Sequence, residues 1–467
     1  MNARSTRWLS SIVALGVVVR IACWWFKGGF HYPDEIFQQL EPAHYLRTGV
    51  AWLPWEFVRG VRSWILPGFY AALLELLSWF GITGLPALRF VTLHNALWSV
   101  LMVPAGYRVG AALCARSDSE AERAGLAVAL FTALLPTLVY YTPHTLIGTP
   151  AMIAMSWGYV FWLESRGAER FNSNLLLRCG LFFGIAGALR FTAGFHMLVP
   201  VLDLLWRHRA RALRPLLMGA ALPVLAVGIV DLFTWGWPFH STVGYLRHHL
   251  FEGAADRTSA WGFYFAESLW GRFGPLAALS CFVLLAGLRQ TWIVALAIIV
   301  PTFLLSFVPL KQDRFLMNNW PLLAAALGIG WVVLVRWVKA RAPALAMAVG
   351  VTIMILVIVS NLEGTSELPW TLRRGMFRAQ SFVGGQDDAT GLLFEDRQHM
   401  NGGYLVFDRN APQVQYEQGQ ATNPLFNYAA LEDGGADATG LLRMGWAEVA
   451  RFDEIVVLRR EPAIFQP

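Results

Sequence analysis

The chain has 467 residues, of which 56% are hydrophobic and only 15% are charged, and its mean hydropathy is +0.47. Since soluble globular proteins carry roughly 25% charged residues, this composition excludes an ordinary soluble domain and indicates a polytopic membrane protein. The net charge of +6 does not indicate a nucleic-acid partner, because the basic residues form short clusters between apolar runs instead of one continuous stripe.

The apolar runs predict the membrane spans, each of which takes roughly 20 residues of helix. We expect about eleven transmembrane helices, at residues 8–26, 65–81, 86–112, 124–141, 146–163, 175–206, 215–233, 268–288, 292–309, 318–338 and 343–360. The run 175–206 is long enough to form two half-helices. The first run ends in the aromatic cluster Cys23–Phe26 and not in a small-residue cleavage site, so we expect it to stay uncleaved.

Basic residues between the spans predict the orientation, because cytoplasmic loops carry an excess of Lys and Arg. The basic clusters are Arg4 with Arg7, residues 207–214 and residues 336–341. The segments that then lie together outside the cytoplasm are the first long loop, 27–64, the second long loop, 234–267, and the short segment 310–314.

The composition changes after residue 360, where the chain becomes polar and rich in Gly, Asp and Glu. Tyr404–Phe407 and Glu454–Leu458 read as strands. We therefore predict an all-α polytopic membrane module over residues 1–360, followed by a small extracytoplasmic α/β domain over residues 361–467.

The first loop carries two adjacent acids, Asp34 and Glu35. Pro33 suits the first turn of a helix, so both acids lie near the positive end of that helix, where they have at least a capping role. An apolar face follows at Ile36, Phe37, Leu40 and Ala43, and it predicts a helix lying along the membrane surface. A carboxylate held at that surface is suited to act as general base on an acceptor hydroxyl.

Further charges lie beside apolar runs at the same predicted face. The guanidinium fork of Arg62, just before a span, suits a phosphate group. Asp231 lies at the outer end of another span, and acids within membrane segments are functional by default. Lys311, Asp313 and Arg314 lie between two apolar runs, where they either extend harmlessly to the interface or neutralise a lipid-linked phosphate.

Other chemistries have less support. His248 and His249 are adjacent, but consecutive side chains diverge and no third ligand has clear spacing, so we expect no metal site. No Gly-rich phosphate loop follows a strand, which argues against a nucleotide-sugar or ATP site. The four cysteines lie in or beside apolar runs and read as small buried hydrophobes.

Four segments, in this order, resemble the lipid-linked mannosyltransferases that build N-glycan precursors and GPI anchors (glycosyltransferase family 22, GT-C fold). His31–Glu41 resembles the family's His-Pro-Asp-Glu-aromatic-x-Gln…Glu motif, with Tyr32 inserted. Pro54–Glu56 followed by Arg62-Ser63 looks like its Thr-Trp-Glu and Arg-Ser elements. Asp231–Trp237 is similar to its Asp…Tyr-Gly-x-Trp segment. Lys311–Phe315 is similar to its His-Lys-Glu-x-Arg-Phe element, with Leu310 where the family has His.

The resemblance implies a mannosyltransferase in the lipid bilayer that takes mannose, or another hexose, from a polyprenyl- or dolichyl-phosphate donor. It transfers the sugar with inversion to a hydroxyl of a glycolipid or glycan acceptor, without a metal or other cofactor. Asp34 is the expected general base, with Glu35 as second choice. The substrate-binding residues that the resemblance implies are His31, Gln38, Glu41, Trp55, Glu56, Arg62, Asp231, Lys311, Asp313 and Arg314.

The resemblance, together with an Arg/Ala-rich composition, suggests a bacterial member in the inner membrane with its site facing outside, or facing the lumen of the endoplasmic reticulum if eukaryotic. Three alternatives stay open. The first is another GT-C transferase that moves a pentose or a different hexose, the second is a transporter or lipid flippase, and the third is a non-catalytic scaffold. The paired halves that many transporters carry are not visible in this sequence.

Overall fold

The computed structural model describes residues 3–115, 117–251, 259–395 and 401–460. The chain forms two compact units. The helical unit consists of residues 1–24 and 94–368, and the mixed unit consists of residues 25–93 and 369–467.

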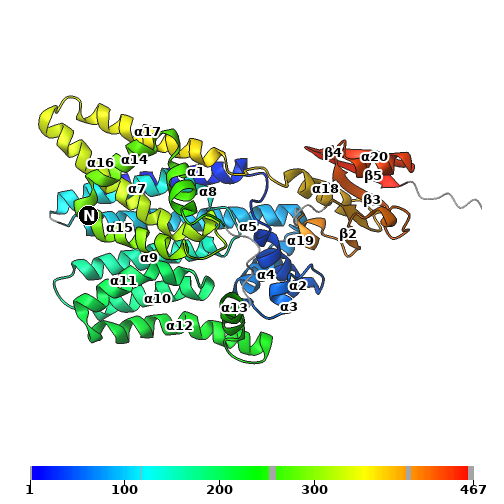
Figure 1. Ribbon diagram of the computed structural model, residues 1–467, viewed down its shortest axis with the longest axis horizontal. Coiled ribbons are helices and arrows are strands. Elements are labelled where there is room, and N and C mark those ends of the chain that lie inside the picture. The colour runs from blue at the N-terminus through cyan, green and yellow to red at the C-terminus, as the bar shows by residue number, and fades with distance from the viewer. Residues whose placement is uncertain (1–2, 116, 252–258, 396–400, 461–467) are drawn as a thin grey trace, which may run out of the picture. The chain divides into compact units, whose positions relative to one another are not determined.

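The helical unit is built from long apolar helices (Figure 1). The bounds of its helices are α1 (Ala3–Phe26), α6 (Met102–Leu113), α7 (Asp118–Leu134), α8 (Pro136–Tyr140), α9 (Gly148–Gly167), α10 (Ser173–Leu189), α11 (Ala193–His208), α12 (Ala210–Trp235), α13 (His240–Phe251), α14 (Ala277–Ala286), α15 (Leu288–Leu305), α16 (Trp320–Arg341) and α17 (Ala346–Ser366). Helix α5 (Gly84–Trp98) is divided between the units, with residues 84–93 in the mixed unit and residues 94–98 in the helical unit. Short 3-10 and π segments lie between them at η2 (Ser99–Leu101), η3 (Tyr264–Trp270), η4 (Gly271–Leu276) and η5 (Asp313–Asn319).

Small residues set the closest helix packing in this unit. At Gly180 of α10 an added Cβ would lie 2.1 Å from the carbonyl oxygen of Leu216 in α12. At Gly219 of α12 it would lie 2.0 Å from the carbonyl oxygen of Leu177 in α10. The two glycines therefore let the helix backbones touch, which is the usual way in which membrane helices gain packing contacts.

By length and composition, seven helices in the described part of the chain are able to cross a membrane. They are Ala3–Phe26, Gly84–Leu113, Ala210–Trp235, Tyr264–Ala286, Leu288–Leu305, Asp313–Arg341 and Ala346–Ser366, and two shorter apolar helices are Ile65–Ser78 and Ser173–Leu189. The prediction of a helical multi-pass membrane protein is confirmed. The predicted run 175–206 is indeed two helices, α10 and α11, because the chain is extended at Arg190 (φ −139°, ψ 108°).

The mixed unit contains a five-stranded sheet of order β2-β1-β3-β5-β4 (Figure 1). The strands are β1 (Leu392–Phe394), β2 (Gln413–Gln415), β3 (Tyr428–Glu432), β4 (Trp446–Phe452) and β5 (Ile455–Arg460). Strand β1 runs parallel to β2 and β3, whereas β5 runs antiparallel to β3 and β4. The helices of the first loop, η1 (Ile36–Leu40), α2 (Glu41–Thr48) and α3 (Trp55–Val58), and the apolar helix α4 (Ile65–Ser78) that follows it belong to the same unit.

Alternate residues of the strands face two different helices, as strand geometry requires. Ile455 and Val457 pack in the cluster that includes helix α18 (Arg374–Gly384). Val456 and Leu458 pack in the cluster that includes helix α20 (Ala436–Arg443). The sheet is therefore covered on both faces, and the predicted small α/β region is confirmed.

The two strand predictions in this region had different outcomes. Glu454–Leu458 is confirmed as part of β5, whereas the prediction of a strand at Tyr404–Phe407 is wrong, because these residues form the short helix α19 (Gly403–Phe407). Tertiary contacts override the strand propensity here: the N–H of Leu405 donates to the carboxylate of Glu41 at 2.8 Å. The predicted division into residues 1–360 and 361–467 stays a prediction.

Candidate functional site

The first loop forms a helix directly after Pro33, as the sequence predicts. The N–H groups of Ile36 and Phe37 both donate to the carbonyl oxygen of Pro33, at 3.0 and 2.9 Å. Asp34 and Glu35 are the first two helical residues. Asp34 is partly exposed, whereas Glu35 is fully buried, so the two adjacent acids have different environments.

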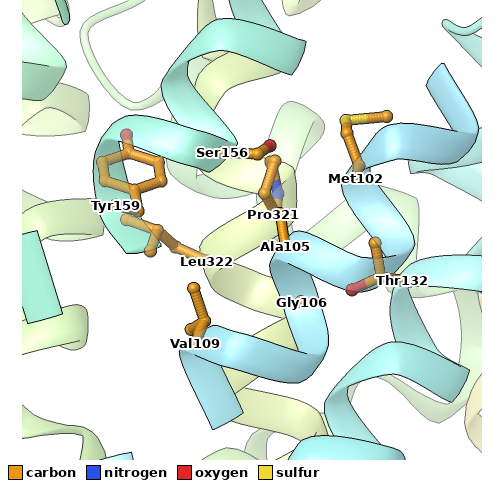
Figure 2. A pocket seen from close by; sticks show the side chains of 9 residues that line it. All are labelled: Met102, Ala105, Gly106, Val109, Thr132, Ser156, Tyr159, Pro321 and Leu322. Atoms are coloured by element: carbon orange, nitrogen blue, oxygen red, sulfur yellow. The ribbon is translucent and has the colours of Figure 1, made fainter. Parts of the chain in front are cut away.

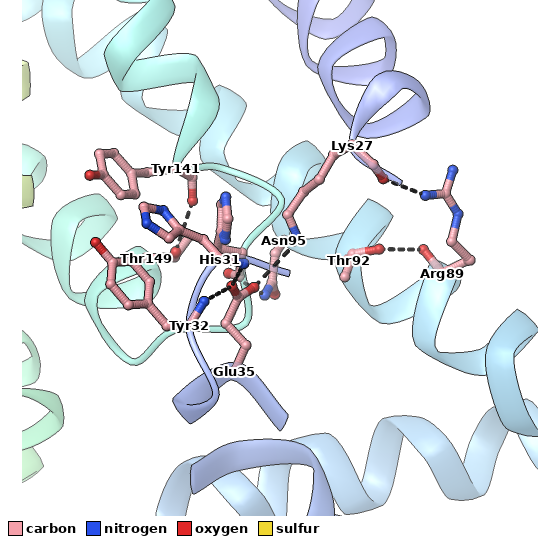
Figure 3. Close-up of polar contacts among 10 residues, drawn as sticks. Lys27, His31, Tyr32, Glu35, Arg89, Thr92, Asn95, Tyr141 and Thr149 are labelled. Carbon is pink, nitrogen blue, oxygen red and sulfur yellow. Dashed lines mark hydrogen bonds and ion pairs between the residues drawn. The ribbon is translucent and has the colours of Figure 1, made fainter. Parts of the chain in front are cut away.

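Both carboxylate oxygens of Glu35 are engaged within the loop (Figure 3). Oε1 accepts the N–H groups of His31 at 2.9 Å and Tyr32 at 3.2 Å. Oε2 lies 3.4 Å from Nζ of Lys27, which is itself buried and lies 3.9 Å from the ring centroid of Phe30. Glu35 thus holds the loop together through contacts with Lys27, His31 and Tyr32, and its role in these contacts is structural.

The apolar face of this helix is covered by protein, and the prediction that it lies along the membrane surface is wrong. Ile36, Leu40 and Ala43 are at most 1% exposed. The ring of Phe37 stacks on Trp52, with centroids 6.4 Å apart. The amphipathic pattern was read correctly as one face, but the face packs into the protein's own core.

Glu41 is buried at the start of α2. Its Oε2 accepts the N–H of Trp52 and its Oε1 accepts the N–H of Leu405, both at 2.8 Å. Burial raises the pKa of Glu41 to about 7, although backbone N–H groups oppose the shift. Three residues further on, burial and the charge of Arg47 lower the pKa of His44 to about 4.

Of the remaining first-loop candidates, two form a buried hydrogen-bonded pair and two others are exposed or partly exposed. Nε2 of Gln38 donates to Oε1 of Glu56 at 2.7 Å, and both side chains are buried. Trp55 is exposed, and the guanidinium of Arg59 lies 5.7 Å from its ring centroid. Arg62 is partly exposed in the turn before α4.

Asp231, in the helical unit, is fully buried near the end of α12. Its Oδ2 accepts both the N–H and the hydroxyl of Ser241, at 2.9 and 2.6 Å. Its Oδ1 has no hydrogen-bond partner among the described residues. Nearby, the His240 ring lies 4.9 Å from that of Trp237. Residues 252–258 of the second predicted loop, and the side chain of His249, lie outside the described residues.

The segment before α16 is held by an arginine that the sequence did not single out. Arg272 pairs with Asp313, and its Nη1 donates to the carbonyl oxygen of Gly364 at 2.9 Å. The hydroxyl of Ser268 also donates to Asp313. Asp313 is therefore neutralised by Arg272 and anchors the chain next to Lys311, whose Nζ donates to a backbone carbonyl at 2.9 Å.

Arg190 joins this basic segment. Its guanidinium lies 5.3 Å from the ring centroid of Phe315, and that of Arg314 lies 5.9 Å from the same centroid. Gly148, the first residue of α9, permits this position, because a Cβ there would lie 2.3 Å from Nη1 of Arg190. Arg190 lies inside the apolar run 175–206, and a charge within such a run is a signal for function that can be read from the sequence.

The structure thus groups the candidates in two sets. The set in the mixed unit is His31, Asp34, Glu35, Gln38, Glu41, Trp55, Glu56 and Arg62. The set in the helical unit is Asp231, Lys311, Asp313 and Arg314, to which the contacts add Arg190 and Arg272.

Two further features are not candidates. A pocket of about 10 Å³ lined by Thr132, Ser156 and Tyr159 has room for one water at most, and so is too small for a sugar phosphate (Figure 2). Among the described residues, no three His, Cys, Asp or Glu side chains gather as a possible metal site.

Known proteins resemble this chain in sequence and fold. GPI mannosyltransferase 3 of Yarrowia lipolytica is 28% identical over 306 residues, which cover 64% of this chain and 57% of that protein. The probable Dol-P-Man:Man(7)GlcNAc(2)-PP-Dol alpha-1,6-mannosyltransferase of Schizosaccharomyces pombe is 24% identical over 290 residues, 59% of this chain and 48% of that protein. The chain therefore spans about half the length of these relatives.

The fold has a counterpart among solved structures. ArnT from Cupriavidus metallidurans, whose crystal structure contains undecaprenyl phosphate, has a TM-score of 0.61 at 14% identity, and the match covers 99% of each chain. This likeness shows a GT-C fold. The model of the Alg9-like mannosyltransferase family matches residues 11–373, which is more than half of the chain. The chain therefore belongs to the Alg9-like mannosyltransferase family, glycosyltransferase family 22.

Proposed function

We propose that this protein is a membrane mannosyltransferase that uses a polyprenyl- or dolichyl-phosphate mannose as donor and a hydroxyl of a glycolipid as acceptor. The observation that carries the proposal is the family match over residues 11–373, which includes the loop with Asp34. The name of the fission-yeast relative contains dolichyl-phosphate mannose, and the solved counterpart contains a polyprenyl phosphate. Both names support a lipid-phosphate donor.

The proposed reaction is a single inverting displacement. The acceptor oxygen attacks C1 of the mannose, the bond between C1 and the phosphate oxygen breaks, and the lipid phosphate leaves with the electron pair. The acceptor's proton passes to Asp34, the general base. Asp34 is preferred because it is partly exposed, whereas both oxygens of Glu35 already accept bonds within the loop.

The leaving phosphate gains negative charge, and basic side chains stabilise that charge. We assign this role to Arg62, Lys311 and Arg314, and we add Arg190, because its guanidinium and that of Arg314 lie within 6 Å of the same ring centroid. In this proposal Asp313 positions the segment through Arg272 and does not bind the substrate. His31, Gln38, Trp55, Glu56 and Asp231 stay the other proposed substrate-binding residues, whereas Glu41, whose two oxygens accept backbone N–H groups, is assigned to holding the loop.

The proposal includes about eleven spans and a bacterial inner-membrane location, or an endoplasmic-reticulum location in a eukaryote. The first loop and the C-terminal domain, residues 361–467, then lie on the extracytoplasmic or lumenal side. This orientation follows from the basic clusters 207–214 and 336–341, which favour the cytoplasm.

A transfer assay tests the function. Purified protein in lipid nanodiscs receives polyprenyl-phosphate mannose or GDP-mannose, each with labelled sugar, together with a glycolipid extract. We expect labelled glycolipid and free polyprenyl phosphate from the first donor only. Absence of transfer from every polyprenyl-phosphate sugar would overturn the proposal, and transfer from a pentose donor alone would change the sugar that we assign.

A further inference from the structure

The first loop is joined to the C-terminal region by backbone hydrogen bonds. The N–H groups of Gly28 and Gly29 donate to the carbonyl oxygen of Trp370 at 3.1 and 3.3 Å, and the N–H of Phe30 donates to that of Leu372 at 2.9 Å. A Cβ on Gly29 would lie 1.8 Å from the Leu372 oxygen. Glycine is therefore required at position 29 for the two segments to meet this closely.

A second junction lies at Glu41. Its carboxylate accepts the N–H of Trp52, within the same loop, and the N–H of Leu405, in α19 of the C-terminal region. Gly403 has a left-handed backbone (φ +63°), and a Cβ there would lie 2.2 Å from Cδ of Glu41. The carboxylate thus occupies the space where a larger residue 403 would have its side chain, and it holds the loop against α19.

Trp52 forms the third junction. Its ring stacks on Phe37 of the loop helix and lies 5.2 Å from the ring of Phe394 in β1 and 6.5 Å from that of Tyr404 in α19. Phe37 is three residues after Asp34, one turn further along the same helix. Trp52 therefore lies between the Asp34 helix and the aromatic residues of β1 and α19.

We infer that the C-terminal region is the scaffold that sets the direction of the Asp34 helix, and that Glu41 is the positioning residue through which it does so. The three junctions all lie within the mixed unit, on both sides of Asp34 in sequence. Without Glu41, the buried N–H of Leu405 and the partly buried N–H of Trp52 lose their acceptor, and this loss weakens the attachment of the loop to α19. The expected effect on the transfer rate rests on the proposed function, whereas the expected effect on the attachment of the loop does not.

The test compares Glu41→Ala and Glu41→Gln with the matched control Glu448→Gln, an exposed glutamate on β4 that bonds to Arg451. Hydrogen exchange of loop peptides from residues 27–58 measures the mechanical effect in the full-length protein. We expect faster exchange in Glu41→Ala, a smaller change in Glu41→Gln, whose amide oxygen keeps one N–H partner, and no change in the control.

Transfer kinetics measure the catalytic effect. A misplacement of about 1 Å costs roughly 100-fold in rate, so we expect kcat of Glu41→Ala to fall by about that factor while KM for the donor changes less than about twofold. We expect partial recovery of kcat in Glu41→Gln, which a mere loss of folded protein would not produce. If Glu41→Ala folds poorly, Glu41→Gln and its kcat decide.

Wild-type loop exchange and wild-type kcat in both Glu41 variants would overturn the inference. A wild-type protein without transferase activity would instead overturn the proposed function. In that case the exchange measurement alone decides whether Glu41 and the C-terminal region hold the loop.

Discussion

The ammonium group of Lys27 lies 3.4 Å from the carboxylate of Glu35, and both side chains are buried within the first loop. A buried charge that keeps its partner is tolerated, but one that loses its partner is strongly destabilising. Glu35 therefore compensates the buried charge of Lys27, and its other oxygen accepts two backbone N–H groups.

This pair gives a stability prediction. Lys27→Met leaves the Glu35 carboxylate buried without its cation, and we expect a loss of about 3–5 kcal/mol in the free energy of unfolding. Glu35→Gln keeps Oε1 as acceptor but turns an N–H₂ group toward Lys27. The double variant removes both problems and should be more stable than Lys27→Met. Denaturant titration in mixed micelles checks the order, and a double variant less stable than Lys27→Met would contradict it.

The effects of Arg272 and Asp313 on activity should depend on each other. Each holds the chain next to Lys311, so Arg272→Gln and Asp313→Asn are both expected to lower kcat/KM, although neither residue is assigned to touch the donor. Because the two side chains are in direct contact, their effects should not add, and we expect a coupling energy of about 1–3 kcal/mol in a double-mutant cycle. Additive losses would show that Asp313 acts independently of Arg272.

Arg190 is expected to bind the donor phosphate. A hydrogen bond to a charged group contributes about 1.5–3 kcal/mol, so Arg190→Gln should weaken inhibition by undecaprenyl phosphate about ten- to a hundredfold and raise KM for the donor. Arg178→Gln is the matched control, because Arg178 is an exposed arginine of α10 whose guanidinium lies 5.8 Å from the ring of Phe161. Equal inhibition constants in wild type and Arg190→Gln would refute the assignment.

The pKa of Glu41 predicts a pH dependence of stability. Because burial raises this pKa from 4.5 to about 7, the folded protein binds more protons than the unfolded chain between these values. The contribution of Glu41 is therefore fully present below about pH 4.5 and is lost as the pH rises through about 7. Its size is up to about 3 kcal/mol.

Glu41→Gln removes this titration. Relative to that of Glu41→Gln, the thermal midpoint of the wild type should be lower at pH 8 than at pH 5, when both are measured with the same detergent and ionic strength. A difference that is constant over this range would show that Glu41 titrates near its ordinary value.

Local patterns in the sequence were enough to predict the helical membrane fold, the break within residues 175–206 and the helix that begins after Pro33. They predicted helix content well because apolar runs, Pro and Gly act over a few residues. The strand predicted at Tyr404–Phe407 was wrong because an acceptor 364 residues away, Glu41, receives one of its N–H groups. No local pattern carries that information.

The candidate site shows the same limit. The family resemblance ranked Asp34 before Glu35, but the local sequence does not distinguish two adjacent acids. In the structure, the contacts of Glu35 with Lys27 and two backbone N–H groups distinguish them. Arg272 was missed although it lies inside the predicted span 268–288, because its partner Asp313 is 41 residues away in the sequence. Arg190, by contrast, was visible as a charge inside an apolar run, but its proximity to Phe315 depends on how α10 and η5 pack.

The most direct test of the central claim is the rate of mannose transfer from polyprenyl-phosphate mannose by Asp34→Asn. Asp118→Asn, an exposed acid in the first turn of α7, is the control. General-base catalysis contributes about 10²- to 10⁴-fold, so we expect kcat of Asp34→Asn to fall by that factor with little change in KM for the donor, and kcat of Asp118→Asn to equal wild type. Wild-type turnover by Asp34→Asn would contradict the account.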